Sequence, residues 1–179
     1  MIKKIIIKNN EKGLVFKNDV LINVIEQGVH WFFFGDKIEV CSGYNQFFEI
    51  EEGIFEHLLL KDQLDILEIK DDELALVFEK SNFKHVFVPG VYAFWKGQHP
   101  FVFQTVSMAT FEIQNVSKTI LEKPQMNAYV RNYRVESFEK GLLFVDGVFE
   151  KMLAPGNYFY WKNHQNITVA KGDTRVQTL

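Results

Sequence analysis

The stretch that decides the fold is Glu11-Lys12-Gly13-Leu14-Val15-Phe16, because the chain repeats its pattern twice more. The pattern returns as Glu73-Leu74-Ala75-Leu76-Val77-Phe78 and as Glu139-Lys140-Gly141-Leu142-Leu143-Phe144. In each copy a glycine follows the glutamate after 17 positions: Gly28 (28−11), Gly90 (90−73) and Gly156 (156−139). Agreement without gaps across three copies indicates a tandem repeat.

An aromatic run follows each of these glycines, three residues on in the first copy and two residues on in the others. The runs are Trp31-Phe32-Phe33-Phe34, Tyr92-Ala93-Phe94-Trp95 and Tyr158-Phe159-Tyr160-Trp161. In the second and third copies a proline precedes the glycine, which favours a sharp corner in the chain. Each copy therefore has a hairpin pattern, a corner and an aromatic strand.

One copy reads as a small antiparallel β unit of four to five strands. Residues 11–17 and 20–26 alternate as strands do, and only Asn18-Asp19 separates them. The third copy has Asp146-Gly147 at the same place, which suits a two-residue hairpin turn, and the second copy has the weaker Lys80-Ser81. Further strands are expected before each hairpin, at 4–8, 65–70 and 129–136, and after the first and third aromatic runs, at 37–41 and 166–170.

The sequence thus predicts a mainly β fold of three tandem modules, with short helices in the spacers. We place the modules at 1–52, 65–110 and 129–179, and the helical spacers at 53–64 and 111–128. The first spacer has an apolar stripe that favours a short amphipathic helix over about 54–64. Pro124 favours a short helix on one or both sides of itself in the second spacer.

The repeated apolar side chains share one face of a strand, since they lie on a period of two. We expect that face to form the core of each module; its residues are Leu14, Phe16, Leu76, Phe78, Leu142 and Phe144. The aromatic runs cannot point to one side only, because side chains alternate along a strand. Their outer residues either pack between modules, as in repeat proteins, or form an exposed patch that marks an interface.

The composition excludes several classes of protein. The 179 residues carry a net charge of −3, which argues against a dedicated nucleic-acid binder. A hydrophobic content of 47% argues against disorder, and no apolar run approaches the length of a membrane-spanning helix. The single Cys41 excludes an intramolecular disulfide. These features predict a soluble chain, and the lone cysteine suits a cytoplasmic setting.

No sequence pattern for catalysis or cofactor binding is present. The five histidines show no metal-ligand spacing, and Cys41 is expected to be a buried structural thiol. The carboxylates at 49–52 fit a solvated edge, and Asp71-Asp72 fits a turn better than a calcium loop. We therefore predict a protein that is not an enzyme and has no catalytic residue, cofactor or metal.

The third copy resembles the slipin and stomatin proteins of the band 7, or SPFH, superfamily. The likeness rests on residues 134–147 and on Asp173, Arg175, Gln177 and Leu179, which match an Asp-x-Arg-x-Gln-x-Leu segment that opens the band 7 domain. The two earlier copies are similar to the N-terminal extension of some bacterial slipins. The resemblance implies self-assembly and scaffolding at a membrane, although the band 7 body itself would follow Leu179.

We accordingly predict the non-catalytic N-terminal β-repeat region of a slipin-like protein, which assembles or binds a protein partner beside a membrane scaffold. Membrane association would come only through the parent protein. The candidate interface residues are Trp31, Phe33, Trp95, Trp161, Glu11, Glu73 and Glu139. The repeated glutamates have a structural alternative, as hairpin-edge residues that pair with lysine or accept backbone hydrogen bonds. The alternative functions are a free-standing β-repeat binding protein and, less favoured, a small enzyme or ligand binder with a site between modules.

Overall fold

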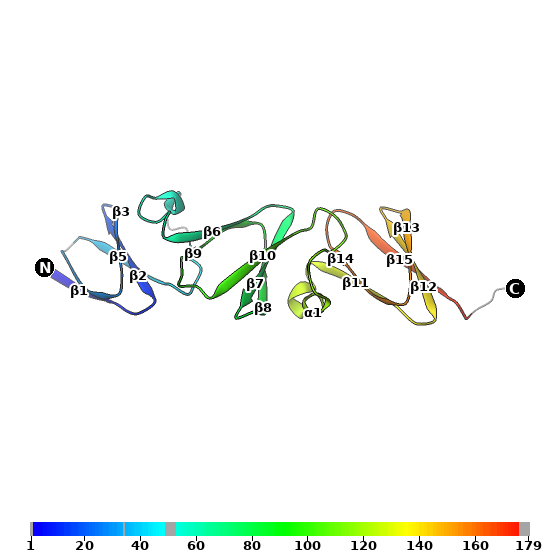
Figure 1. Ribbon diagram of the computed structural model, residues 1–179. Helices are drawn as coiled ribbons and strands as arrows, with labels where there is room; N and C mark the ends of the chain where they lie inside the picture. Colours follow the sequence, from blue (N-terminus) through cyan, green and yellow to red (C-terminus); the bar gives the residue numbers. More distant parts are fainter. Residues whose placement is uncertain (1, 34, 49–52, 176–179) are drawn as a thin grey trace. The chain divides into compact units, whose positions relative to one another are not determined.

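The computed structural model describes residues 2–33, 35–48 and 53–175, and it is mainly β (Figure 1). Each repeat contains five strands. The first repeat has β1 (Ile2–Ile7), β2 (Glu11–Lys17), β3 (Val20–Ile25), β4 (Gly28–Phe33) and β5 (Lys37–Ser42). The second has β6 (Leu64–Ile69), β7 (Glu73–Glu79), β8 (Asn82–Phe87), β9 (Gly90–Trp95) and β10 (Phe101–Ser107). The third has β11 (Val130–Val135), β12 (Glu139–Val145), β13 (Val148–Leu153), β14 (Gly156–Trp161) and β15 (Ile167–Asp173).

The strands of each repeat pair in the same order. The first and fourth strands form a two-stranded ladder, and the third, second and fifth strands form a three-stranded sheet in that order. The ladders are β1-β4, β6-β9 and β11-β14, and the sheets are β3-β2-β5, β8-β7-β10 and β13-β12-β15. The predicted mainly β fold of repeated antiparallel modules is therefore confirmed.

The hairpins of the three sheets are copies of one another in detail. Their two central residues have positive φ in every copy: Asn18 and Asp19, Lys80 and Ser81, Asp146 and Gly147. Positive φ at both positions is the signature of the turn that matches the twist of a hairpin. A bulge interrupts each pairing at the same place, before Phe16, Phe78 and Phe144.

The corner glycine of each repeat needs a backbone conformation that other residues rarely adopt. Its φ is 151° in Gly28, 149° in Gly90 and 157° in Gly156. In every copy the side chain two residues later, which is His30, Tyr92 or Tyr158, folds back over this corner. His30 Nε2 lies 2.8 Å from the carbonyl oxygen of Glu26, and the Tyr158 hydroxyl donates to that of Ala154 at 2.8 Å.

The spacers are less helical than the sequence indicated. The first contains only a three-residue 3₁₀ helix, η1 (Ile54–Glu56), because His57 adopts an extended conformation and ends it. The predicted helix over about 54–64 is thus largely replaced by turns. The second spacer has a short helix on each side of its break, α1 (Lys118–Leu121) and η2 (Pro124–Met126), with Pro124 at the start of η2 as predicted.

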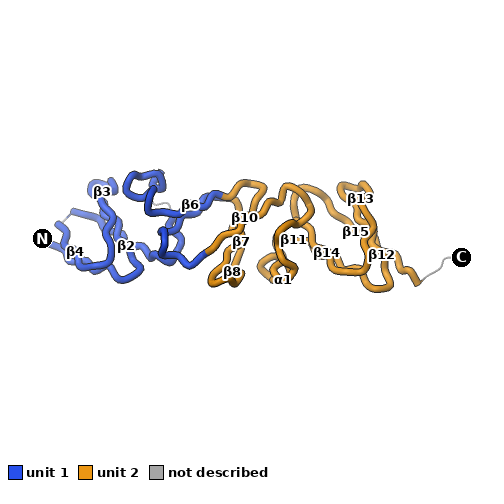
Figure 2. Tube along the Cα trace, viewed as in Figure 1, with its two compact units in different colours: residues 1–68, 90–101 blue, residues 69–89, 102–179 orange. Residues whose placement is uncertain are grey.

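The chain divides into two compact units, and the division cuts through the second repeat (Figure 2). Unit 1 is Met1–Glu68 with Gly90–Phe101, so it joins the first repeat to nearly all of the β6-β9 ladder. Unit 2 is Ile69–Pro89 with Val102–Leu179, so it joins the β8-β7-β10 sheet to the third repeat. Compactness therefore groups the sheet of one repeat with the ladder of the next.

The cores explain this grouping and correct one prediction. In unit 1 the face of β2 that carries Leu14 and Phe16 does not form the core of its own repeat. The opposite face does so, through Val15 with Ile7 and Ile25. Leu14 and Phe16 belong instead to a cluster with Leu64, Ala93 and Trp95 of the next ladder. The prediction missed this because β2 is buried on both faces.

Candidate interaction surfaces

The same four positions on every sheet form what we call the sheet face. They comprise two positions on the second strand and two on the third, related by the hairpin register. The sets are Leu14, Phe16, Leu21 and Val24; Leu76, Phe78, Phe83 and Val86; and Leu142, Phe144, Phe149 and Met152.

Three positions on every ladder form what we call the ladder face. One lies at the start of the first strand, and two lie on the fourth strand, three and five residues after the corner glycine. The sets are Ile2, Trp31 and Phe33; Leu64, Ala93 and Trp95; and Val130, Phe159 and Trp161.

Within unit 1 the sheet face of the first repeat packs on the ladder face of the second. Trp95 and Ala93 are fully buried there, and Leu14 and Phe16 are 0% and 2% exposed. The Phe47 ring packs at a tilt against that of Trp95, with 5.2 Å between the ring centroids, and Ile54 and Leu60 of the spacer complete the cluster. Burying a large aromatic ring in this way contributes strongly to stability.

Unit 2 contains a second junction built from the equivalent residues. Leu76 packs with Trp161 and Val130, and the half-buried Phe78, Phe83 and Val86 join the cluster. Leu121 and Met126 of the second spacer complete this cluster, as Ile54 and Leu60 of the first spacer do in unit 1. The two junctions therefore use one rule: the sheet face of one repeat covers the ladder face of the next.

The two faces that have no neighbouring repeat among the described residues are open. On the third sheet, Leu142 is 36% exposed, Phe149 54% and Met152 57%. On the first ladder, Ile2 is 60% exposed, Trp31 64% and Phe33 75%. Single exposed apolar residues are ordinary, but these positions are the ones that the same chain buries in its two junctions.

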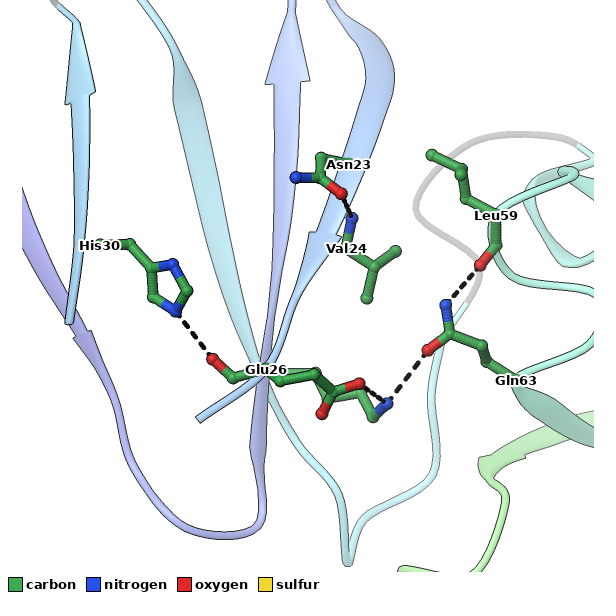
Figure 3. Close-up of polar contacts among 7 residues, drawn as sticks. Asn23, Val24, Glu26, His30, Leu59 and Gln63 are labelled. Atoms are coloured by element: carbon green, nitrogen blue, oxygen red, sulfur yellow. Dashed lines mark hydrogen bonds and ion pairs between the residues drawn. The ribbon is translucent and has the colours of Figure 1, made fainter. Parts of the chain in front are cut away.

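A lysine lies at the centre of the first junction. Lys12 is 8% exposed, its ammonium pairs with the Glu26 carboxylate, and it lies 5.0 Å from the Trp95 ring centroid. Gln63 holds it from the other side, because its amide oxygen accepts from Lys12 at 3.0 Å while its amide nitrogen donates to the Leu59 carbonyl (Figure 3). A buried charge needs such partners. The equivalent residues are Leu74, which is buried in the second junction, and Lys140, which is exposed.

The repeated glutamates have the same structural role in all three copies. Each carboxylate accepts a hydrogen bond from the backbone N–H three residues earlier: Glu11 from Lys8 at 2.9 Å, Glu73 from Lys70 at 3.2 Å and Glu139 from Glu136 at 2.9 Å. Each glutamate N–H donates back to the carbonyl of that same residue. This reciprocal pair closes the turn between the first two strands, as the structural alternative predicted.

The four predicted aromatic candidates divide into two classes. Trp31 and Phe33 are exposed and remain candidates for contact with a partner. Trp95 and Trp161 are 0% exposed, so they lie in the junction cores and cannot reach a partner from the folded chain. The sequence prediction grouped these residues because it located the aromatic runs without their register, and Trp31 is two positions out of step with the later tryptophans.

The histidines and the cysteine have local structural contacts. His99 lies 3.2 Å from the Asp65 carboxylate and accepts from the Phe101 N–H, and His57 accepts from the Leu59 N–H. Burial, and secondarily Glu39, raises the pKa of the Cys41 thiol to about 11, which disfavours the nucleophilic thiolate. Within the described part of the chain, no three His, Cys, Asp or Glu side chains gather in a metal-binding arrangement.

Two surface depressions bear on the ligand-binding alternative. The larger, of about 720 Å³, lies in unit 1 beside Phe55, Glu56, Lys61, Ile66 and Glu68. The other, of about 540 Å³, lies in unit 2 and combines Asp71 and Asp72 with His164. Asp71 and Asp72 form the predicted turn, and His164 is the one histidine that lines this depression. The carboxylate run at 49–52 lies outside the described residues.

The segment that carries the family resemblance is partly described. Asp173 pairs with Arg175, whose guanidinium lies 3.7 Å from the Phe138 ring centroid, and Thr174 bonds the Phe138 carbonyl. The bidentate contact with Arg175 lowers the pKa of Asp173. These contacts tie the end of β15 to the turn before β12. Gln177 and Leu179 lie outside the described residues.

Comparison of the chain with protein-family models, with curated proteins and with solved structures found no match. Among the described residues, no helix is long and apolar enough to span a membrane.

Proposed function

We propose that this chain is a non-catalytic docking module, which joins other protein through the open sheet face of its third repeat and the open ladder face of its first. The observation that carries the proposal is the pair of internal junctions. They supply two examples of what these faces bind when a complementary face is present.

A few large side chains supply most of the free energy expected from docking. Phe33 and Phe149 are respectively 75% and 54% exposed, while the equivalent Trp95 and Leu21 are 0% and 5% exposed. Covering such side chains contributes roughly 1.5–3 kcal/mol each before the costs of association are subtracted. Clustered apolar residues with this exposure are typical of interaction sites.

We further propose that the parent protein is slipin-like and that the module serves assembly at a membrane scaffold. The support is the resemblance over the third repeat, which includes Asp173 and Arg175. The reading frame downstream of codon 179 tests this part. A band 7 domain there is the expected result, and a stop codon directly after Leu179 contradicts it.

Site-specific photo-crosslinking in the organism that carries the gene tests the docking function. A benzophenone side chain replaces Phe33 or Phe149, and Leu58, which is 78% exposed in the first spacer, provides the control position. We expect protein adducts from both faces and far fewer from position 58. Equal yields from all three positions would contradict a docking function.

A further inference from the structure

The two open faces are complementary to each other, not merely apolar. In both junctions a sheet face contacts a ladder face, and among the described residues one face of each kind is uncovered. From this we infer that the partner is a second copy of this chain, whose first ladder docks head to tail on the third sheet. The inference rests on the proposed docking function and specifies its partner.

The residues at the two open faces match the internal pairs in type. Phe33 corresponds to Trp95 and Trp161, and Ile2 corresponds to Leu64 and Val130, so each substitution keeps an apolar side chain. On the opposing side, Phe149 corresponds to Leu21 and Phe83, and Met152 to Val24 and Val86. Phe144 and Phe149 meet edge to face with their ring centroids 5.9 Å apart, as Phe78 and Phe83 do at 6.0 Å in the covered sheet.

The central charge also has a counterpart. Lys12 lies over the Trp95 ring in the first junction, and Lys140 is its equivalent on the open sheet. In the head-to-tail pair Lys140 faces the ring of Phe33 from the second copy, which allows a cation–π contact. Glu26, which neutralises Lys12, corresponds to Ala154, so Lys140 has no such carboxylate at that position.

The interface between copies is expected to be weaker than the internal junctions. Each internal junction gains apolar side chains from a spacer, such as Leu60 or Met126, and a covalent link that removes the cost of association. Sheet-to-ladder contact is heterologous, because the two surfaces differ. It therefore adds copies successively, in a ring or a filament, instead of stopping at a symmetric dimer.

Sedimentation equilibrium with complementary variants tests this inference. Phe149→Glu disables the sheet face and Phe33→Glu disables the ladder face; both residues are exposed, so the fold should remain intact. We expect the wild-type chain to form species larger than a dimer as concentration rises. Each variant alone should lose association by about tenfold or more, and the equimolar mixture should form a one-to-one dimer through the two intact faces.

Val20→Glu is the matched control, because Val20 is 58% exposed on β3 and lies outside both faces. It should associate like wild type, and circular dichroism should show unchanged strand content in all variants. A second variant, Lys140→Leu, copies Leu74 of the second junction and should strengthen association several-fold.

Each other outcome overturns head-to-tail docking. Association of Phe33→Glu alone would indicate sheet-to-sheet pairing, and association of Phe149→Glu alone would indicate ladder-to-ladder pairing. A wild-type chain that stays monomeric at near-millimolar concentration would exclude a second copy. The docking function would still stand in that case if photo-crosslinking at Phe33 and Phe149 yielded adducts with another protein.

Discussion

Equivalent apolar positions are buried on the sheet of the first repeat and exposed on the sheet of the third. Leu14, Phe16 and Leu21 are covered by the β6-β9 ladder, whereas Leu142 and Phe149 are exposed. The strand order, hairpin register and bulge are the same in both sheets. The difference shows that this apolar face is buried where a ladder packs on it and exposed where none does.

The largest expected effect comes from removing a junction tryptophan. Trp95→Ala should lower the free energy of unfolding by roughly 3–5 kcal/mol, because it leaves a cavity among Leu14, Phe16 and Phe47. Phe33→Ala, at the equivalent but open position, should change it by less than about 0.5 kcal/mol. Urea titration followed by circular dichroism measures both, and equal losses would remove the distinction between covered and open ladders.

Thiol labelling compares the same two sheets at another matched position. Cys41 on β5 and Gly172 on β15 pair with Lys12 and Lys140, respectively. Burial raises the pKa of Cys41 to about 11, so at pH 8 its thiolate fraction should be about a hundredfold below that of an exposed cysteine. We expect a thiol reagent to label Gly172→Cys in a Cys41→Ser background about that much faster than wild-type Cys41.

The buried Cys41 thiol should make the protein less stable as the pH rises above 9. The folded pKa of Cys41 is raised from an ordinary value of 9.0, so its contribution is present below pH 9 and is lost as the pH rises toward 11. Cys41→Ser should reduce that loss between pH 9 and 11. An identical alkaline profile for the variant would contradict a buried thiol.

The corner glycines provide the next test, because all three repeats have one, whether their faces are covered or open. Gly156→Ala should cost roughly 1–3 kcal/mol of stability, because φ is 157° and alanine is strained there. Gly172→Ala is the control, because a Cβ at that position meets only open space and φ is ordinary. A similar cost for the two variants would show that the corner is not strained.

The repeated glutamate should have a smaller effect, equal in covered and open repeats. Glu73→Ala and Glu139→Ala each remove one turn hydrogen bond and should cost about 0.5–1.5 kcal/mol. Glu73→Gln keeps an acceptor oxygen and should recover part of the loss. If the alanine variants instead lose association at unchanged stability, the glutamates are partner contacts after all.

The smallest expected effect concerns the hairpin turn of the second sheet. Lys80 and Ser81 adopt positive φ without being residues that favour it. Replacing them with Asn-Gly should raise the free energy of unfolding by about 0.4–1 kcal/mol. The same replacement at Asp146-Gly147 should be close to neutral, and differential scanning calorimetry can compare the two.

The sequence was sufficient to predict what is local. The repeated pattern at residues 11–16 predicted the hairpins, and the glycine spacing predicted the corners at Gly28, Gly90 and Gly156. It did not predict which neighbour each face packs against, because Leu14 and Val15 are both buried and no periodicity distinguishes their two clusters. It also missed that His30, Tyr92 and Tyr158 lie over equivalent corners, because the first copy has a histidine where the others have a tyrosine.

The sequence located the aromatic runs but did not show which of their residues are exposed, for the same reason. Trp31, Trp95 and Trp161 look alike in the aromatic runs, yet the strand register places Trp31 level with Ala93 and Phe33 level with Trp95. Counting from the corner glycine would have shown this shift. Whether a face is covered depends on long-range packing, which a run of aromatic letters does not encode.

The most direct test of the account uses the three tryptophans, since one lies in each repeat. The chain is labelled with 5-fluorotryptophan, and the ¹⁹F resonances are compared in H₂O and D₂O at a concentration low enough to prevent association. We expect a full solvent isotope shift for Trp31, which is 64% exposed, and almost none for Trp95 and Trp161, which are 0% exposed. Full shifts at Trp95 and Trp161 would show that the sheet faces do not cover the following ladders.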